Sequence, residues 1–78
     1  MARALTMVER RVPAGERIQY LQQLAERRVA AEHARVHFWV FEHEDESGRF
    51  VEFTEGASAT DIAAAHDGEL PAPLWREV

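Results

Sequence analysis

The chain contains no cysteine, and all nine of its basic residues are arginine. Without cysteine it can form neither a disulfide nor a thiolate metal site, two supports on which many small domains depend. Its 78 residues make at most one domain, spanning 1–78. A domain of this size buries only about 60–65% of its unfolded surface. Oligomerisation is therefore the support that we expect.

The chain also lacks an excess of positive charge. Its 14 acidic residues outnumber the 9 basic ones, which gives a formal net charge of −5. Because nucleic-acid binding requires a basic surface that neutralises phosphates, we expect no nucleic-acid partner. No apolar run approaches the roughly 18 residues that span a bilayer, and the N-terminus lacks the apolar region of a signal peptide. We therefore expect a cytoplasmic protein with no membrane partner.

The most informative stretch of the sequence lies between residues 36 and 55. Two runs rich in aromatic and β-branched residues, 36–43 and 49–55, flank a polar segment that ends in Gly48. This arrangement is typical of a β-hairpin. Residues 45–48 favour a type I turn followed by a left-handed glycine, in a loop of three or four residues.

The first arm of this hairpin is apolar on both faces. Because side chains alternate across a strand, its two faces carry separate sets of residues. These sets are Val36, Phe38 and Val40 on one face, and His37, Trp39 and Phe41 on the other. A single layer of helices covers only one face of a sheet. We therefore expect a homodimer that pairs through its sheet faces, with a second copy of the sheet covering the other side.

The register of the hairpin stays open, because a slip of one residue exchanges the faces of the second arm. In one register Val51 and Phe53 share a face with Trp39 and Phe41. In the other register they share a face with Phe38 and Val40.

Residues 14–34 are predicted to form a helix. Apolar residues recur there at spacings of three and four, and the segment holds no helix breaker. The residues predicted to face the core are Ile18, Leu21, Ala25 and Val29, with Leu24 beside them. Those predicted to face solvent are Glu16, Arg17, Gln22, Gln23, Glu26 and Arg27.

The remaining segments complete an α+β fold. Residues 3–12 are predicted to form a strand, and Ser58 is the predicted N-cap of a short helix that ends near Gly68. Residues 74–78 form either a short edge strand or an irregular tail. The order predicts a ferredoxin-like β-α-β-β-α(-β) fold with an antiparallel sheet.

A family resemblance rests on four segments in this order: 12–15 entering a helix, 41–45 ending a strand, 49–53 beginning the next strand, and 64–66 closing the Ala-rich helix. Together they resemble the antibiotic-biosynthesis-monooxygenase-like (ABM-like) proteins of the dimeric α+β barrel superfamily. The resemblance covers roughly 3–67. It implies two ferredoxin-like sheets packed face to face across a two-fold axis.

The resemblance also suggests candidate site residues. His66 matches the helix histidine of the family, which makes it the candidate catalytic residue; the alternative is that it only caps the end of its helix. His37, Trp39, Phe41 and Glu55 are candidate ligand-binding residues, since an apolar wall with a few polar groups is typical of a ligand pocket. Their alternative role is packing at an interface or in the core.

Three functions are compatible with these residues. The first is a small homodimeric barrel protein that binds an apolar or aromatic molecule between its helices and sheet. The second, implied by the resemblance, is a cofactor-independent monooxygenase or isomerase acting on an aromatic or polyketide-like substrate. The third is a structural or regulatory partner domain. We expect no cofactor. We also expect no metal site within one chain, because His37 and His43 lie about 20 Å apart along a strand.

Overall fold

The protein is an α+β fold in which two helices pack on one face of a four-stranded antiparallel sheet. The computed structural model describes residues 2–71 and 73–78. The elements in chain order are β1 (Ala4–Arg11), the 3-10 turn η1 (Ala14–Glu16), α1 (Arg17–Ala34), β2 (His37–Glu42), β3 (Arg49–Gly56), α2 (Ala59–Ala65) and β4 (Leu74–Arg76). The predicted α+β class and antiparallel sheet are confirmed.

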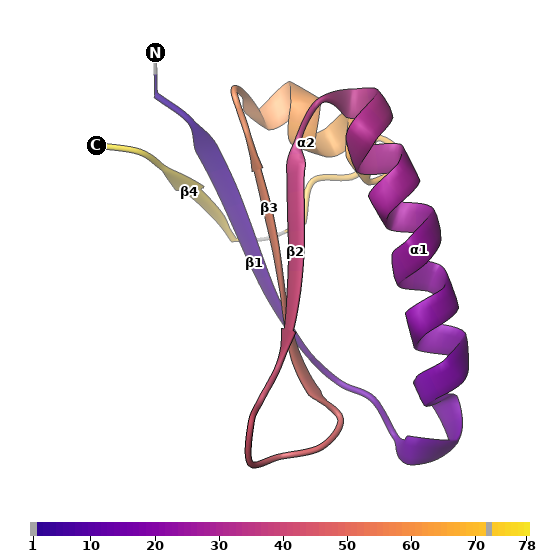
Figure 1. The fold of residues 1–78 in the computed structure, drawn as a ribbon. Coiled ribbons are helices and arrows are strands. Elements are labelled where there is room, and N and C mark those ends of the chain that lie inside the picture. The colour runs from indigo at the N-terminus through magenta and orange to yellow at the C-terminus, as the bar shows by residue number, and fades with distance from the viewer. Residues whose placement is uncertain (1, 72) are drawn as a thin grey trace.

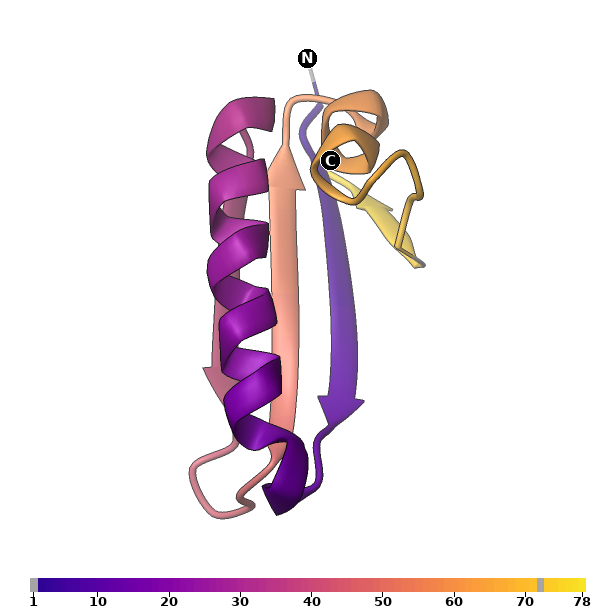
Figure 2. The same cartoon turned by 90° about the vertical axis from the view of Figure 1, so that its right-hand side faces the viewer.

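The strands lie in the order β2-β3-β1-β4, and every neighbouring pair is antiparallel. The two longer strands, β1 and β3, therefore occupy the centre. Of the two alternatives for the C-terminal segment, the edge strand is the one observed: β4 pairs with β1 over Leu74–Arg76. Figure 1 shows both helices on one side of the sheet and no helix or strand of the described residues on the other, and Figure 2 shows the helix side. The smallest extent of the molecule is 17 Å, which suits one sheet and one helical layer.

Local signals explain how α2 begins and ends. The side chain of Ser58 accepts the backbone N–H of Asp61 at 3.2 Å, which satisfies a donor at the helix start. Gly68 adopts a φ of 84° and donates its N–H to the carbonyl of Ala63 at 2.8 Å. This glycine-dependent geometry ends the helix where the sequence predicted it.

The hairpin adopts the register that places Trp39 opposite Phe53 and Phe41 opposite Val51. Its loop runs from His43 to Gly48, so the predicted loop of three or four residues is wrong. The carboxylate of Glu42 explains the longer path.

Glu42 lies where this loop begins and accepts hydrogen bonds from two residues. Its carboxylate accepts the N–H of Gly48 at 2.9 Å and two bonds from Arg17 at 2.6 and 2.8 Å. The Arg17 guanidinium, with the Gly48 N–H second, lowers the pKa of Glu42 to about 2. Glu42 therefore ties the open end of the hairpin to the start of α1.

The core between helices and sheet consists of two apolar clusters. One contains Ala4, Ala31, Val36, Ile62 and Ala65. The other contains Tyr20, Leu24 and Phe50. Three buried polar residues also lie in this layer, namely Thr6, Glu52 and Thr54. The helix–sheet layer is therefore partly polar, and its apolar core is small.

α1 turns a different face to the sheet than its apolar spacing predicted. The predicted core residues Ile18, Leu21, Ala25 and Val29 are exposed. Of the predicted core residues only Leu24 is buried, and it is joined by Tyr20 and Ala31. The reason is packing against β3, because the rings of Tyr20 and Phe50 lie 4.7 Å apart and Leu24 joins the same cluster. Because a different face of α1 packs on the sheet, Arg27, which was predicted to face solvent, is partly buried.

Gly48 is the glycine on which the hairpin most depends. Its φ is +85°, and a Cβ there would lie 2.5 Å from the carbonyl oxygen of Val12. Gly48→Ala should therefore lower the free energy of unfolding by about 1–3 kcal/mol, measured by urea denaturation. Gly15→Ala is the matched control, because a Cβ at Gly15 meets nothing within 4 Å. Equal losses in the two variants would contradict this account of the loop.

Candidate functional site

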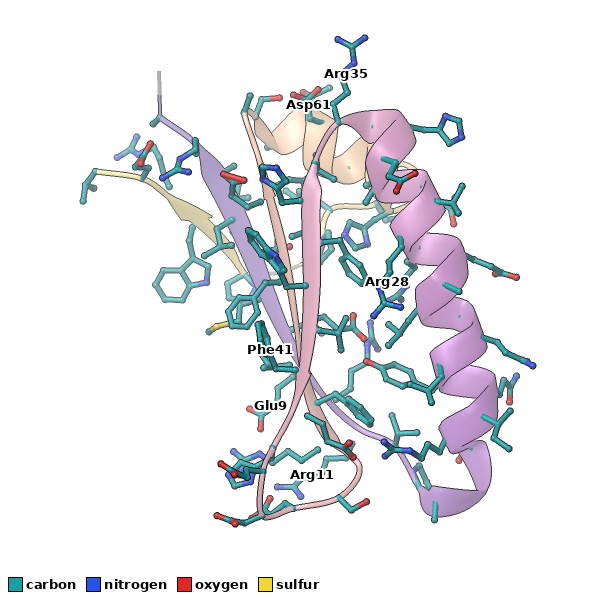
Figure 3. The ribbon with its side chains drawn as sticks, viewed as in Figure 1. Glu9, Arg11, Arg28, Arg35, Phe41 and Asp61 are labelled. Atoms are coloured by element: carbon teal, nitrogen blue, oxygen red, sulfur yellow. The ribbon has the colours of Figure 1, made fainter. Side chains whose placement is uncertain are left out.

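The five candidate site residues lie on opposite sides of the sheet. His66 lies on the helix side, where its Nε2 is 2.9 Å from the hydroxyl of Thr54. Candidates His37, Trp39 and Phe41 alternate with the helix-facing residues of β2 and so lie on the bare side. Figure 3 shows the labelled Phe41 pointing away from α1. The structure therefore brings the predicted ligand-binding residues together but does not bring them to His66.

Glu55 joins the candidates on the bare side. The Nδ1 of His37 lies 2.8 Å from its carboxylate, and the His37 ring stacks on Trp39 with centroids 5.6 Å apart. The exposed fractions of Trp39 and Phe41 are 47% and 57%. A shallow hollow of about 260 Å³ lies between Trp39 and Trp75. This side of the sheet is a surface rather than an enclosed pocket.

The apolar residues of the bare side continue across all four strands. We call them the bare sheet face, and they are Leu5, Met7, Trp39, Phe41, Val51, Phe53 and Trp75. Ion pairs lie at both ends of this face. At one end Arg3 contacts Glu55 at 3.2 Å and Glu77 at 2.8 Å, and at the other Arg49 contacts Glu9 at 2.6 Å. The face thus has an apolar centre and charged ends.

A buried charged cluster that the sequence pattern did not predict lies around Glu52 on the helix side. This carboxylate is only 3% exposed, and it accepts the O–H of Tyr20 at 2.6 Å. Arg27 Nη1 donates to it at 2.6 Å and Arg10 Nε at 2.8 Å. The three donors come from α1 and β1, so the cluster ties three elements together. A buried carboxylate requires such partners, because its desolvation is costly.

One signal in the sequence pointed to this cluster. Glu52 sits between Phe50 and Thr54 in the alternation of β3, at a position that faces the helices once the hairpin register is known. A glutamate whose side chain faces the helices requires hydrogen-bond donors from the helix that covers it. Tyr20 and Arg27 are seven residues apart on α1, a spacing that places both on one face.

The pKa values of two side chains beside Glu52 are shifted by burial and by the charges of the cluster. Burial, and then the hydrogen bond to Glu52, raise the pKa of the Tyr20 hydroxyl, so it stays protonated and donates. Partial burial, followed by the positive charge of Arg27, lowers the pKa of His66. The imidazole is therefore neutral at pH 7, and its edge-to-face contact with Phe38, 6.4 Å between centroids, helps fix the ring.

A cleft opens to solvent beside this cluster, between α1 and the segment that follows α2. Its volume is about 790 Å³. Its lining includes Arg10, Arg27, His66, Leu70 and Pro71. The space beside His66 is thus lined by charged and apolar groups together, and it differs from an enclosed apolar pocket.

Across residues 2–71 and 73–78, no cluster of three or more His, Asp or Glu side chains has the arrangement of a metal site. None of the helices in this described part has the length and apolar character required to cross a membrane. Comparisons of the chain with family models, curated proteins and solved structures found no match. The geometry of the two sides of the sheet is therefore the basis for any functional assignment.

The hydrogen bond from Tyr20 to Glu52 should contribute measurably to stability. Tyr20→Phe removes the donor and keeps the ring that packs on Phe50. The free energy of unfolding should fall by about 1–2 kcal/mol, since a buried charged acceptor loses one partner. Thermal and urea denaturation measure the change. An unchanged stability would mean that Glu52 does not depend on the Tyr20 hydroxyl.

The charge of Arg27 should be detectable at His66. In an NMR titration His66 should titrate below 6.5, and Arg27→Gln should raise its pKa because a neighbouring positive charge is lost. Arg28→Gln, one position along α1 and outside the cleft lining, is the control. A pKa of His66 that is the same in all three proteins would contradict this assignment.

The same shift has a consequence for stability. The folded state binds the His66 proton more weakly than the unfolded state, in which the pKa is about 6.5. The free energy of unfolding should therefore decrease as pH falls from about 6.5 through the lower pKa of the folded protein. His66→Gln should lack this component of the pH dependence.

Proposed function

We propose that two copies of this protein pair through their bare sheet faces as a closed dimeric α+β barrel of ferredoxin-like protomers. The observation that carries the proposal is the bare sheet face itself, an apolar surface running across all four strands on the side without helices. Contiguous apolar patches of this kind mark interaction sites on soluble proteins.

The form of the face favours a second copy over an unrelated partner. Its centre is apolar and aromatic, and its ends carry side chains of both signs, which is the anatomy of a protein interface. A two-fold axis through the middle of the sheet places each face on an identical one, so apolar centre meets apolar centre. The small core on the helix side adds a reason, because a domain of this size gains stability by sharing a second core.

We further propose that the dimer binds a small molecule with an apolar or aromatic body in the cleft beside His66. Leu70 and Pro71 supply apolar lining to this cleft. In this arrangement His37, Trp39, Phe41 and Glu55 belong to the dimer interface. Of these four, Trp39 and Glu55 line the hollow between Trp39 and Trp75, which the partner sheet would close, so a ligand role on this side applies to them.

An enzymatic function, a cofactor-independent monooxygenase or isomerase, is the second candidate. One observation favours it. The His66 imidazole is held neutral beside the cleft, with its Nε2 engaged by Thr54, and a neutral imidazole can accept a proton from a substrate. The same residue in a binding protein would only shape the cleft wall.

The dimer is tested by measuring mass in solution. Sedimentation or light scattering at micromolar concentration should give twice the 8.9 kDa of one chain. Phe41→Glu places a charge among the aromatic residues of the interface and should raise the dimer dissociation constant by about 100-fold or more. Ile18→Glu is the control, because Ile18 is 75% exposed on the outer side of α1.

Two results would overturn the dimer. One is a wild-type protein that is monomeric at about 100 µM, a concentration at which even weak specific dimers form. The other is a dimer that Phe41→Glu leaves intact and Ile18→Glu dissociates, which would move the interface to the helical side.

A further inference from the structure

We propose that the molecule bound in the cleft carries a single carboxylate, which Arg10 and Arg27 bind together. The inference rests on the ligand site proposed above and names the chemical class of its ligand. Arg10 and Arg27 reach the cleft from different elements, β1 and α1, and both contact the same buried carboxylate, Glu52. Glu52 therefore holds the two guanidinium groups at one place on the cleft wall.

Each guanidinium keeps hydrogen-bonding capacity for a ligand. An arginine side chain has five N–H donors. Arg10 uses its Nε on Glu52 and Arg27 uses its Nη1, and the described residues supply no other acceptor to either group. Their side chains remain 43% and 34% exposed, and both residues line the cleft as well as a second, smaller hollow beside Tyr20. Guanidinium groups bind carboxylates well because two parallel N–H groups match two oxygens.

The acidic residues of the cleft lining outnumber its two arginines, so the charge preferred in a ligand depends on the groups that the ligand touches. Two guanidinium groups and one carboxylate leave one positive charge in excess in the Arg10–Glu52–Arg27 group. Tyr20 remains protonated and His66 neutral, so neither changes this balance at pH 7. A ligand monocarboxylate would neutralise the excess.

The rest of the cleft lining narrows the class of ligand. Three exposed acidic residues also line the cleft, and they would repel a second negative charge. They are Glu26, Asp67 and Glu69. Ala30, Ala65, Leu70 and Pro71 give the lining an apolar part. The lining therefore suits a monocarboxylic acid with a compact apolar or aromatic body better than a phosphate or a dicarboxylate.

The test compares two probes that differ in charge but little in shape, 2-naphthoate and 2-naphthamide. Each is titrated into the full chain while backbone amide shifts are followed by NMR. Naphthoate should bind with a dissociation constant at least about tenfold smaller than that of naphthamide. The shifted amides should cluster in residues 23–30 and 65–71. Inorganic phosphate at pH 7.5 should bind more weakly than naphthoate.

Three variants test whether the preference for naphthoate over naphthamide depends on the charges of Arg10 and Glu69. Arg10→Gln should raise the dissociation constant of naphthoate about tenfold and leave that of naphthamide within about twofold. Arg28→Gln, which removes the same charge outside the cleft lining, should leave both unchanged. Glu69→Gln should lower the naphthoate constant, because it removes a repelling charge from an exposed residue whose loss does not threaten folding.

The outcomes separate this inference from the proposed function. Equal binding of naphthoate and naphthamide at the cleft would overturn the carboxylate and leave the ligand site standing. Binding of neither probe would overturn the ligand site itself, while the dimer is judged by mass alone. If Arg10→Gln fails to fold, the Glu69→Gln result decides: an unchanged or weaker affinity for naphthoate would overturn the inference.

Discussion

The structure depends on a carboxylate buried between a helix and a sheet. Glu52 lies in the middle of the central strand β3, and burying its charge is tolerable only because Tyr20, Arg27 and Arg10 all donate to it. Two of these donors belong to α1, so the carboxylate restricts the rotation of that helix about its axis. A turn of roughly 130° about the helix axis would bury the aliphatic residues of α1 but would withdraw both donors from the charge.

The need to pair the buried carboxylate of Glu52 makes the two sides of the sheet differ in polarity. Glu52 and the buried threonines Thr6 and Thr54 occupy positions on the helix side that aliphatic residues commonly fill. The helix side is therefore partly polar, while the opposite side carries most of the large aromatic residues. Trp39, Phe41 and Phe53 lie there, and no element within residues 2–71 and 73–78 covers them. The cluster that fixes the helix thus leaves much of the apolar surface for another molecule to bury.

The sequence predicted the features that depend on interactions between near neighbours in the chain. It did not predict the features that depend on contacts between distant residues. Strands, the long helix and the Ser58 cap follow from alternation, spacing and hydrogen bonding between near neighbours. The face of α1 was predicted wrongly, because counting apolar residues gives no weight to a tyrosine or an arginine needed by a distant glutamate. His66 was selected as a candidate, but its neighbours Arg10 and Arg27 were not, since an arginine on a polar helix face is usually solvated.

The two exposed apolar regions, the bare sheet face and the outer stripe of α1, do not call for the same explanation. Ile18, Leu21 and Val29 are aliphatic residues separated by polar ones, and scattered exposure of this kind is ordinary. The bare sheet face is continuous and aromatic, and it is the surface that a partner would cover. The cleft beside Arg27 and His66 opens on the helical layer, on the other side of the sheet from that face. Pairing through the sheets would therefore leave the cleft open, and the assembly and the ligand binding that we propose would occupy separate sides of the same small domain.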